Sequence, residues 1–125
     1  MGQRLWLDDE RPTPWGYDLT AKTADECIRM LREFDDITHV SLDHDLAEEH
    51  YREYLLRAGT GQPLDRSKFE HLTGYAVVEW MVESGRWVNE IHVHTLNDLG
   101  AGDMLEKLLL APEHVTVKRV KPWEV

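Results

Sequence analysis

Cysteine, long apolar runs and basic residues are all scarce in this 125-residue sequence. A single cysteine, Cys27, cannot form a disulfide within the chain, which is typical of proteins from a reducing cytoplasm. No apolar run approaches the roughly 20 residues that a membrane-spanning helix needs. The first residues, which include Arg4 and Asp8, do not form the apolar segment of a secretory signal. We therefore expect a cytoplasmic protein without membrane contact, in which Cys27 is a small buried apolar residue.

The balance of charge is acidic, because 24 Asp and Glu against 14 Lys and Arg give a formal net charge of −10. Nucleic acids and anionic membranes are bound by Lys and Arg that meet phosphates, so binding to bulk duplex nucleic acid is not expected. A small phosphorylated ligand is compatible with this charge, since a bound metal ion can reverse the local sign of a pocket.

The length predicts one domain over residues 1–125. Apolar runs predict strands, and segments with apolar residues at helical spacing predict helices between them. The expected strands are 3–8, 17–22, 38–43, 89–95 and 115–121, and the expected helices begin at Thr23, near Tyr51, at Thr73 and at Gly100. This order predicts an α/β fold with a three-layer, mostly parallel five-stranded sheet.

Two segments depart from this regular alternation. About eight residues separate the first two strands, which is short for a parallel crossover, so the second strand is expected at a sheet edge or in an unusual pairing. Residues 47–72 form an insert. Tyr51, Tyr54 and Leu55 predict a short amphipathic helix in its first half, closed by Gly59. The second half, with its glycines and Pro63, is expected to be mobile.

Ionisable residues stand at the ends of three predicted strands. They are Asp8 and Asp9 after the first strand, Asp43, His44 and Asp45 after the third, and His94 at the end of the fourth. Ligands of open α/β sheets bind outside the carboxyl ends of the strands, so these side chains are expected to meet there. The alternative for Asp8 and Asp9 by themselves is an ordinary turn at the end of a strand.

Carboxylates that gather in one place repel each other, so one must be protonated or a cation must neutralise them. The simplest answer is a divalent metal held by Asp8, Asp9 and Asp43. Oxygen ligands alone favour Mg²⁺ or Mn²⁺. If His44 or His94 joins them, Zn²⁺ or Fe²⁺ also becomes compatible.

The seven histidines divide into site candidates and others. His94 is preferred to His92, because both lie on one face of the strand but His94 is next to its end. His92 is interpreted as a hydrogen-bonded histidine of that face. The remaining ones show no companion pattern and are interpreted as surface residues: His39, His50, His71 and His114.

Four residues are candidates for binding a phosphate. Arg11 can clamp a phosphate bidentately or pair with a neighbouring acid. Thr95 and Asn97 lead into a helix whose free N–H groups attract anions, although an ordinary cap by Asp98 explains the same pattern. Lys121 ends the last strand and can supply a positive charge.

The pattern of these residues resembles a receiver domain. The shared positions are an acidic pair after the first strand, Asp43 after the third, Thr95 after the fourth and Lys121-Pro122 after the fifth. In receivers the acidic residues hold Mg²⁺ and one Asp accepts a phosphoryl group. Three features differ from a signalling receiver: the turn after Asp43 has no Met-Pro, a breaker-rich loop replaces the first helix, and no final helix follows Lys121.

A more specific resemblance is to the cyclic-phosphate-processing receiver-like family. The strings Leu-Asp-Asp-x-Arg-x-x-Pro, Ser-Leu-Asp-His-Asp-Leu, Thr-Gly-Tyr and His-Thr-x-Asn-x-x-Gly are similar to those of that family. The likeness implies a receiver-like (flavodoxin-like) fold with a degenerate first helix and no last helix. The insert 47–72 is longer than is usual in the family and is a candidate substrate lid. The residues that match are Asp8, Asp9, Arg11, Asp43, His44, Asp45, His94 and Asn97.

This resemblance implies a metal-dependent phosphoesterase that hydrolyses a cyclic phosphate or phosphodiester on a nucleotide or an RNA end, in prokaryotic or phage conflict or signalling. The catalytic residues would then be His44, His94 and Asp45, with the imidazoles as general acid and base. One alternative is a non-catalytic binder that sequesters or senses a cyclic nucleotide. Another is a switch that accepts a phosphoryl group on Asp43.

Overall fold

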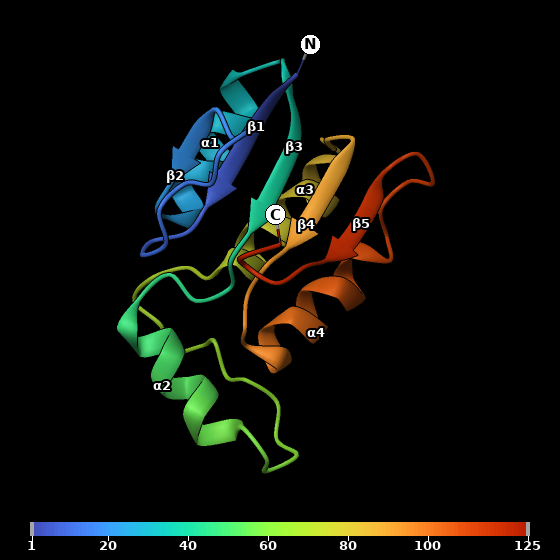
Figure 1. Ribbon diagram of the computed structural model, residues 1–125. Coiled ribbons are helices and arrows are strands. Elements are labelled where there is room, and N and C mark those ends of the chain that lie inside the picture. Colours follow the sequence, from blue (N-terminus) through green and yellow to red (C-terminus); the bar gives the residue numbers. More distant parts are fainter. Residues whose placement is uncertain (1, 125) are drawn as a thin grey trace.

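The computed structural model describes residues 2–124 and contains one five-stranded sheet in which all strands are parallel (Figure 1). The order across the sheet is β2-β1-β3-β4-β5. The strands are β1 (Gln3–Leu7), β2 (Leu19–Ala21), β3 (Ile37–Leu42), β4 (Glu90–Val93) and β5 (Thr116–Arg119). This is the 2-1-3-4-5 order of flavodoxin-like folds, so the predicted receiver-like sheet is confirmed.

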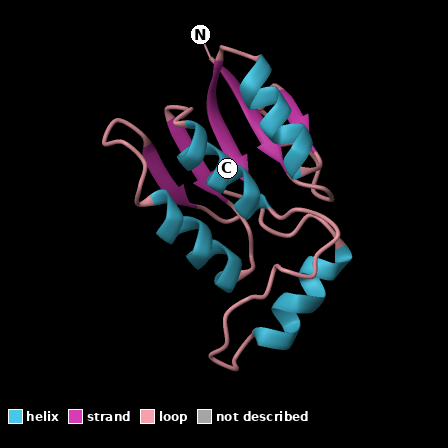
Figure 2. Ribbon diagram, turned by 180° about the vertical axis from the view of Figure 1, so that it is seen from behind, coloured by secondary structure: helices cyan, strands magenta, loops and turns pink. Residues whose placement is uncertain are grey.

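Three helices cover one face of this sheet: α1 (Ala24–Glu33), α3 (Gly74–Ser84) and α4 (Asp98–Leu108) (Figure 2). Among residues 2–124 the opposite face of the sheet carries no helix. The described part of the fold therefore has two layers, the sheet and one layer of helices, instead of the three expected from the sequence. Pro12 and Pro14 exclude a helix from the link between β1 and β2. No helix follows β5 within the described residues.

The core lies between the sheet and its helices. Alternate strand residues such as Leu5, Val40 and Ile91 are buried against helix residues such as Val77 and Met104. Cys27 belongs to this core, as expected, and its thiol is free.

β2 occupies an edge of the sheet, as the short link predicts, and its pairing with β1 is an ordinary parallel one with Leu19 beside Leu5. The link reverses at Gly16, whose φ of 94° favours glycine. It is fixed at Asp18, whose N–H donates to the Arg4 carbonyl (2.9 Å) and whose carboxylate accepts the Arg4 N–H (2.9 Å). A loop can therefore replace the expected crossover helix.

The insert carries α2 (Glu48–Arg57), which extends beyond the carboxyl ends of the strands (Figure 1). The second half of the insert is hydrogen-bonded to α2. Glu49 accepts the N–H of His71 (2.7 Å), and Glu53 accepts the N–H of Asp65 (2.9 Å). Across residues 2–124 no helix combines the length and apolarity needed to cross a membrane.

His50 corrects one prediction, because this histidine is only 1% exposed and does not lie on the surface. Its Nδ1 accepts the Leu46 N–H (2.8 Å), and its Nε2 donates to the His71 carbonyl (2.7 Å). The ring packs on Phe69, with 4.6 Å between centroids. Burial lowers the pKa of His50. The segments that bury it come from both ends of the insert, so local sequence could not show this position.

Candidate functional site

Asp8, Asp43 and His94 meet at the carboxyl edge of the sheet. Asp8 follows β1, Asp43 follows β3 and His94 follows β4, and these three strands are neighbours. One ligand atom from each side chain lies within 4.8 Å of the others, and all three residues are buried. The structure thus brings together three of the residues that the sequence singles out. We call them the Asp8–Asp43–His94 group.

Asp8 is the anion of this group. Its Oδ1 accepts the backbone N–H groups of Glu10 (3.0 Å) and Arg11 (2.9 Å). Its Oδ2 accepts from Arg11 Nη1 (3.0 Å) and His94 Nε2 (3.0 Å). Burial by itself raises the pKa of Asp8, but these hydrogen bonds outweigh it and lower the pKa to about 2.

Asp43 has the opposite electrostatic character. Burial, and then repulsion from Asp8, raise its pKa to about 8, against the opposing effects of Arg11 and of a hydrogen bond from Thr95. The Asp43 Oδ1 accepts the His44 N–H (2.9 Å). Two carboxyl groups so close together require a proton or a cation between them.

Arg11 supplies part of that positive charge. Its Nη1 lies 3.0 Å from Asp8 Oδ2 and 3.3 Å from Asp43 Oδ2, so one nitrogen bridges the two acids. The side chain remains 32% exposed. Pairing with acids, one of the two alternatives from the sequence, is therefore present, and the rest of the guanidinium is available to a ligand.

His94 is held by residues of two strands, β1 and β3, and by Asp8, which follows β1. Its Nδ1 bonds the Ser41 hydroxyl (2.8 Å), its Nε2 bonds Asp8, and its ring stacks on Trp6 with a centroid distance of 3.9 Å. Burial lowers the pKa of His94, although Asp8 opposes the change. Because His94 Nε2 donates to the ionised Asp8, Nδ1 of the neutral ring accepts the Ser41 hydroxyl. Sequence reasoning missed Ser41, whose only signal is a small polar residue inside an apolar strand.

A second cluster lies beside the first and centres on His44. We call its members, His44, Asp45, Asn97 and Arg66, the His44 network. His44 Nδ1 bonds Asp45 Oδ1 (2.7 Å), and His44 Nε2 accepts from Arg66 Nη2 (2.8 Å). The Asn97 amide also donates to Asp45 Oδ1 (3.0 Å). His44 is 1% exposed, and both of its ring nitrogens are engaged.

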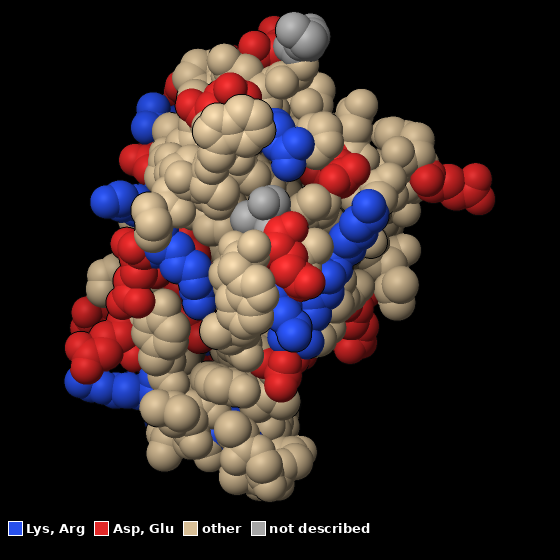
Figure 3. Space-filling view, viewed as in Figure 1, with Lys and Arg blue, Asp and Glu red and all other residues tan. Residues whose placement is uncertain are grey.

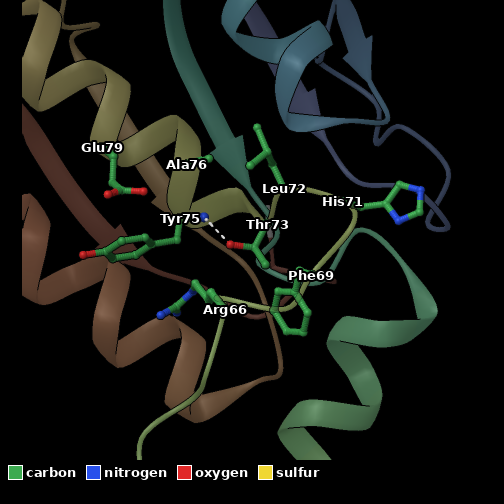
Figure 4. Close-up of a pocket in the computed structure, with 8 residues that line it drawn as sticks. All are labelled: Arg66, Phe69, His71, Leu72, Thr73, Tyr75, Ala76 and Glu79. Atoms are coloured by element: carbon green, nitrogen blue, oxygen red, sulfur yellow. Dashed lines mark hydrogen bonds between the residues drawn. The ribbon is translucent and has the colours of Figure 1, made fainter.

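Arg66 comes from the insert and is a further residue that sequence reasoning missed. Its guanidinium pairs with Asp103 (2.9 Å) and lies over the Tyr75 ring (4.4 Å to the centroid). Figure 4 shows Arg66 beside Tyr75 in a hollow of about 200 Å³, which Phe69 and Thr73 also line. The insert is thereby joined to His44 through a single side chain.

Two glycines allow the His44 network to form. A Cβ on Gly74 would lie 1.8 Å from the Asp43 carbonyl oxygen, and a Cβ on Gly100 would lie 2.5 Å from the His44 ring. The backbone of α3 and of α4 therefore approaches the site too closely for any side chain at these positions. This gives a physical reason for the glycines in the Thr-Gly-Tyr and Asn-x-x-Gly strings.

The remaining predicted site residues occupy different surroundings. Asn97 caps α4, with its Oδ1 accepting the Gly100 N–H (2.8 Å), so Asn97 rather than Asp98 is the cap. Thr95 is buried and lines the cleft described below. Asp9 lies outside the Asp8–Asp43–His94 group, and its Oδ1 is buried without a hydrogen-bond partner among the described residues. Lys121 is exposed, with its ammonium 5.6 Å from the Trp123 ring centroid.

A cleft of about 280 Å³ opens beside the Asp8–Asp43–His94 group. Its lining residues come from the strand ends and from α2: Arg11, Asp43, Asp45, Tyr51, Tyr54, Leu55, Thr95, Leu96 and Asn97. Burial and the nearby carboxylates of Asp43 and Asp9 raise the pKa of Tyr51, so its phenol stays protonated. The insert therefore forms a wall of the cleft that holds the acidic residues.

The model of the cyclic-phosphate processing receiver domain matches residues 3–109 of the chain. The protein belongs to this family. The matched region contains every residue of the Asp8–Asp43–His94 group and of the His44 network. Comparison with curated proteins and with solved structures gives no match.

The site of this receiver-like domain fits a divalent cation by its donor set. Two carboxylates and one imidazole lie close enough to share one ion, whereas Asp9 is not part of this group. Mixed oxygen and nitrogen ligands of this kind are used by several divalent metals. Such an ion would share the oxygens of Asp8 and Asp43 with Arg11.

Proposed function

We propose that this receiver-like domain is a metal-dependent phosphoesterase that opens a cyclic phosphate on a nucleotide or an RNA end. The observation that carries the proposal is the meeting of Asp8, Asp43 and His94 beside a cleft that Arg11 and Thr95 line. Membership of a family linked to cyclic-phosphate processing supports the same reaction class.

A divalent cation held by the Asp8–Asp43–His94 group would polarise a phosphoryl oxygen and lower the pKa of a water molecule. The chain itself positions the substrate. Arg11 engages the two acids through Nη1, which leaves its other nitrogens to donate to a phosphate oxygen. Thr95 lines the same cleft, and its hydroxyl, which is hydrogen-bonded to Asp43, becomes a second donor for the phosphate when that bond opens.

Hydrolysis adds the oxygen of one water to phosphorus and breaks one of the two ring P–O bonds. The departing alcohol oxygen takes up a proton, and the product is a phosphomonoester with a free hydroxyl. His44 and His94 stay the predicted proton-transfer residues. Because both ring nitrogens of each are hydrogen-bonded, one of those contacts has to open on substrate binding for this role.

The engaged histidines favour a second candidate function, which is capture of a cyclic nucleotide without turnover. Capture requires charge and shape at the cleft but no free imidazole. In that case ligand binding depends on Arg11 and Asp43, and incubation with metal yields no product.

The proposal is tested by incubating the protein with 2′,3′-cyclic and 3′,5′-cyclic mononucleotides in Mn²⁺ or in EDTA. Phosphorus NMR distinguishes the cyclic diester from the monoester product. We expect metal-dependent opening that falls by at least about 100-fold in Asp43→Asn.

The matched control is Asp35→Asn, because the Asp35 side chain is fully exposed and precedes β3, at the opposite end of that strand from the site. Turnover in EDTA equal to that in Mn²⁺, or equal loss in both variants, would contradict the proposal. Tight binding with no product under any condition would favour the capture function.

A further inference from the structure

The cleft has two chemically different ends. Asp43, Arg11 and Thr95 form a charged and polar end at the strand termini, whereas Tyr51, Tyr54 and Leu55 of α2 form an apolar wall together with Leu96. Both ends belong to one continuous cavity of about 280 Å³. A ligand that fills this cavity therefore needs an anionic group joined to a flat or apolar part.

The apolar wall is built by one face of α2. Tyr51, Tyr54 and Leu55 follow the i, i+3, i+4 spacing that places side chains side by side on a helix. Leu55 is 73% exposed, and Leu96 is 51% exposed. Such exposed leucines leave apolar area in contact with water that a ring system could cover.

We propose that this wall holds the nucleobase of a nucleoside monophosphate whose phosphate lies at the Arg11 end. The inference rests on the proposed function for its phosphate and names the class of substrate. Aromatic side chains bind the faces of nucleobases with little preference among bases. The two tyrosines and two leucines are accordingly expected to bind the face of a nucleobase without selecting among bases by hydrogen bonds to their edges.

The charge and size of the cleft restrict the ligand to one phosphate. Arg11 is the one cationic residue among those that line the described cavity. The volume of about 280 Å³ is just below the roughly 300–1,000 Å³ of small-molecule sites. A mononucleotide thus fits both limits better than a cyclic di- or trinucleotide.

The surface around this helix agrees with an apolar binding wall. In Figure 3 the lower tip of the molecule, which corresponds to the end of α2 and the loop after it in Figure 1, is mostly uncharged on the visible face, and charged side chains lie beside it. Leu55 and Leu56 of α2 both have exposed apolar side chains. Only Leu55 lines the cleft, so the adjacent pair provides an internal control.

The test compares Leu55→Ser with Leu56→Ser by calorimetric titration in the presence of Mg²⁺. The probes are 3′-AMP and 3′-UMP, adenosine, and glycerol 1-phosphate, none of which contains a cyclic ester to hydrolyse. We expect Leu55→Ser to weaken the binding of 3′-AMP and of adenosine by at least about fivefold, because the base no longer covers the apolar area of Leu55. Leu56→Ser should leave both unchanged, and glycerol 1-phosphate should bind alike to all three proteins.

The inference is overturned if Leu55→Ser leaves nucleotide and nucleoside binding unchanged, or if Leu56→Ser has the same effect. A cyclic dinucleotide is titrated as a further probe, and tighter binding of it than of 3′-AMP would also overturn the inference. Failure of the proposed function gives a different pattern. In that case adenosine still binds through Leu55, whereas glycerol 1-phosphate does not bind and 3′-AMP binds no better than adenosine.

Discussion

Two clusters of polar side chains lie at the same edge of the sheet, and they differ in how their charges are matched. In the Asp8–Asp43–His94 group, two carboxyls share one nitrogen of Arg11, and Asp43 keeps a pKa raised to about 8. In the His44 network, Asp45 accepts from His44 and Asn97, and Arg66 is paired with Asp103. The first cluster thus has two buried carboxyls for one cation, whereas the buried carboxylate of the second accepts from an imidazole and an amide.

This difference indicates that the Asp8–Asp43–His94 group is a binding site and that the His44 network stabilises the structure around it. Two buried carboxyl groups that share one cation are costly unless a ligand or a proton balances their charge, so they indicate a place where something binds. A satisfied network stabilises one arrangement of the loops around it. His44 and Asp45 therefore hold the strand ends and the insert together in this structure, beside the group that is able to bind an ion.

The largest expected effect is a pH dependence of stability that comes from Asp43 of the Asp8–Asp43–His94 group. The folded protein holds the Asp43 proton up to about pH 8, whereas an unfolded aspartate releases it near 3.8. Asp43 therefore stabilises the fold below pH 4, and this contribution is lost as pH rises towards 8. In EDTA the free energy of unfolding should fall by about 1.4 kcal/mol per pH unit from this residue.

The measurement is urea unfolding at pH 5, 6 and 7 for the natural chain and for Asp43→Asn. His50 and His94, whose pKa values are lowered by burial, give a slope of the opposite sign in both proteins. The difference between the two proteins thus isolates Asp43. Parallel pH profiles would show that its carboxyl is ionised in the fold.

The second prediction is that an added side chain at Gly100 disrupts the His44 network by a steric clash. Gly100→Ala places a Cβ 2.5 Å from the His44 ring and should destabilise the fold by about 1–3 kcal/mol, because the ring cannot keep its bonds to Asp45 and Arg66. Gly102→Ala in the same helix meets no atom within 4 Å and should stabilise it by about 0.5–1 kcal/mol. Thermal unfolding of both variants measures the difference, and equal shifts would contradict it.

The third prediction concerns the contact between the insert and the His44 network. Arg66→Ala leaves His44 Nε2 buried without a donor and should cost about 1–3 kcal/mol in the free energy of unfolding. The control is Arg52→Ala, which removes an exposed pair with Glu48 worth about 0.3–0.5 kcal/mol. Hydrogen exchange should also rise in the insert of Arg66→Ala alone. Unchanged protection there would mean that His50 and Glu49 suffice to hold it.

Much of the fold could be predicted from the sequence because its signals are local. The apolar runs identified all five strands, and Thr23 with Glu26 identified the start of α1, where the Thr23 hydroxyl accepts the Glu26 N–H (3.1 Å). The edge position of β2 followed from the length of its link. The three-layer prediction was wrong. The order of strands was taken to imply helices on both faces of the sheet, but Pro12 and Pro14 exclude the helix that would have covered the second face.

The candidate site divides in the same way. The sequence could place Asp8, Asp43 and His94 together, because the carboxyl ends of parallel strands meet at one edge. It could not show that Ser41 orients His94, that His50 is buried, or that Arg66 reaches His44 from 22 residues away. Each of these contacts depends on chain segments with no periodic pattern between them.

The sequence by itself determined which strands form and which acids stand at their ends, because these are properties of local spacing. Only the tertiary structure decided which charges find partners. A carboxylate and its neutralising group need to share only a few ångströms of space, and the path of the loops between strands sets that distance.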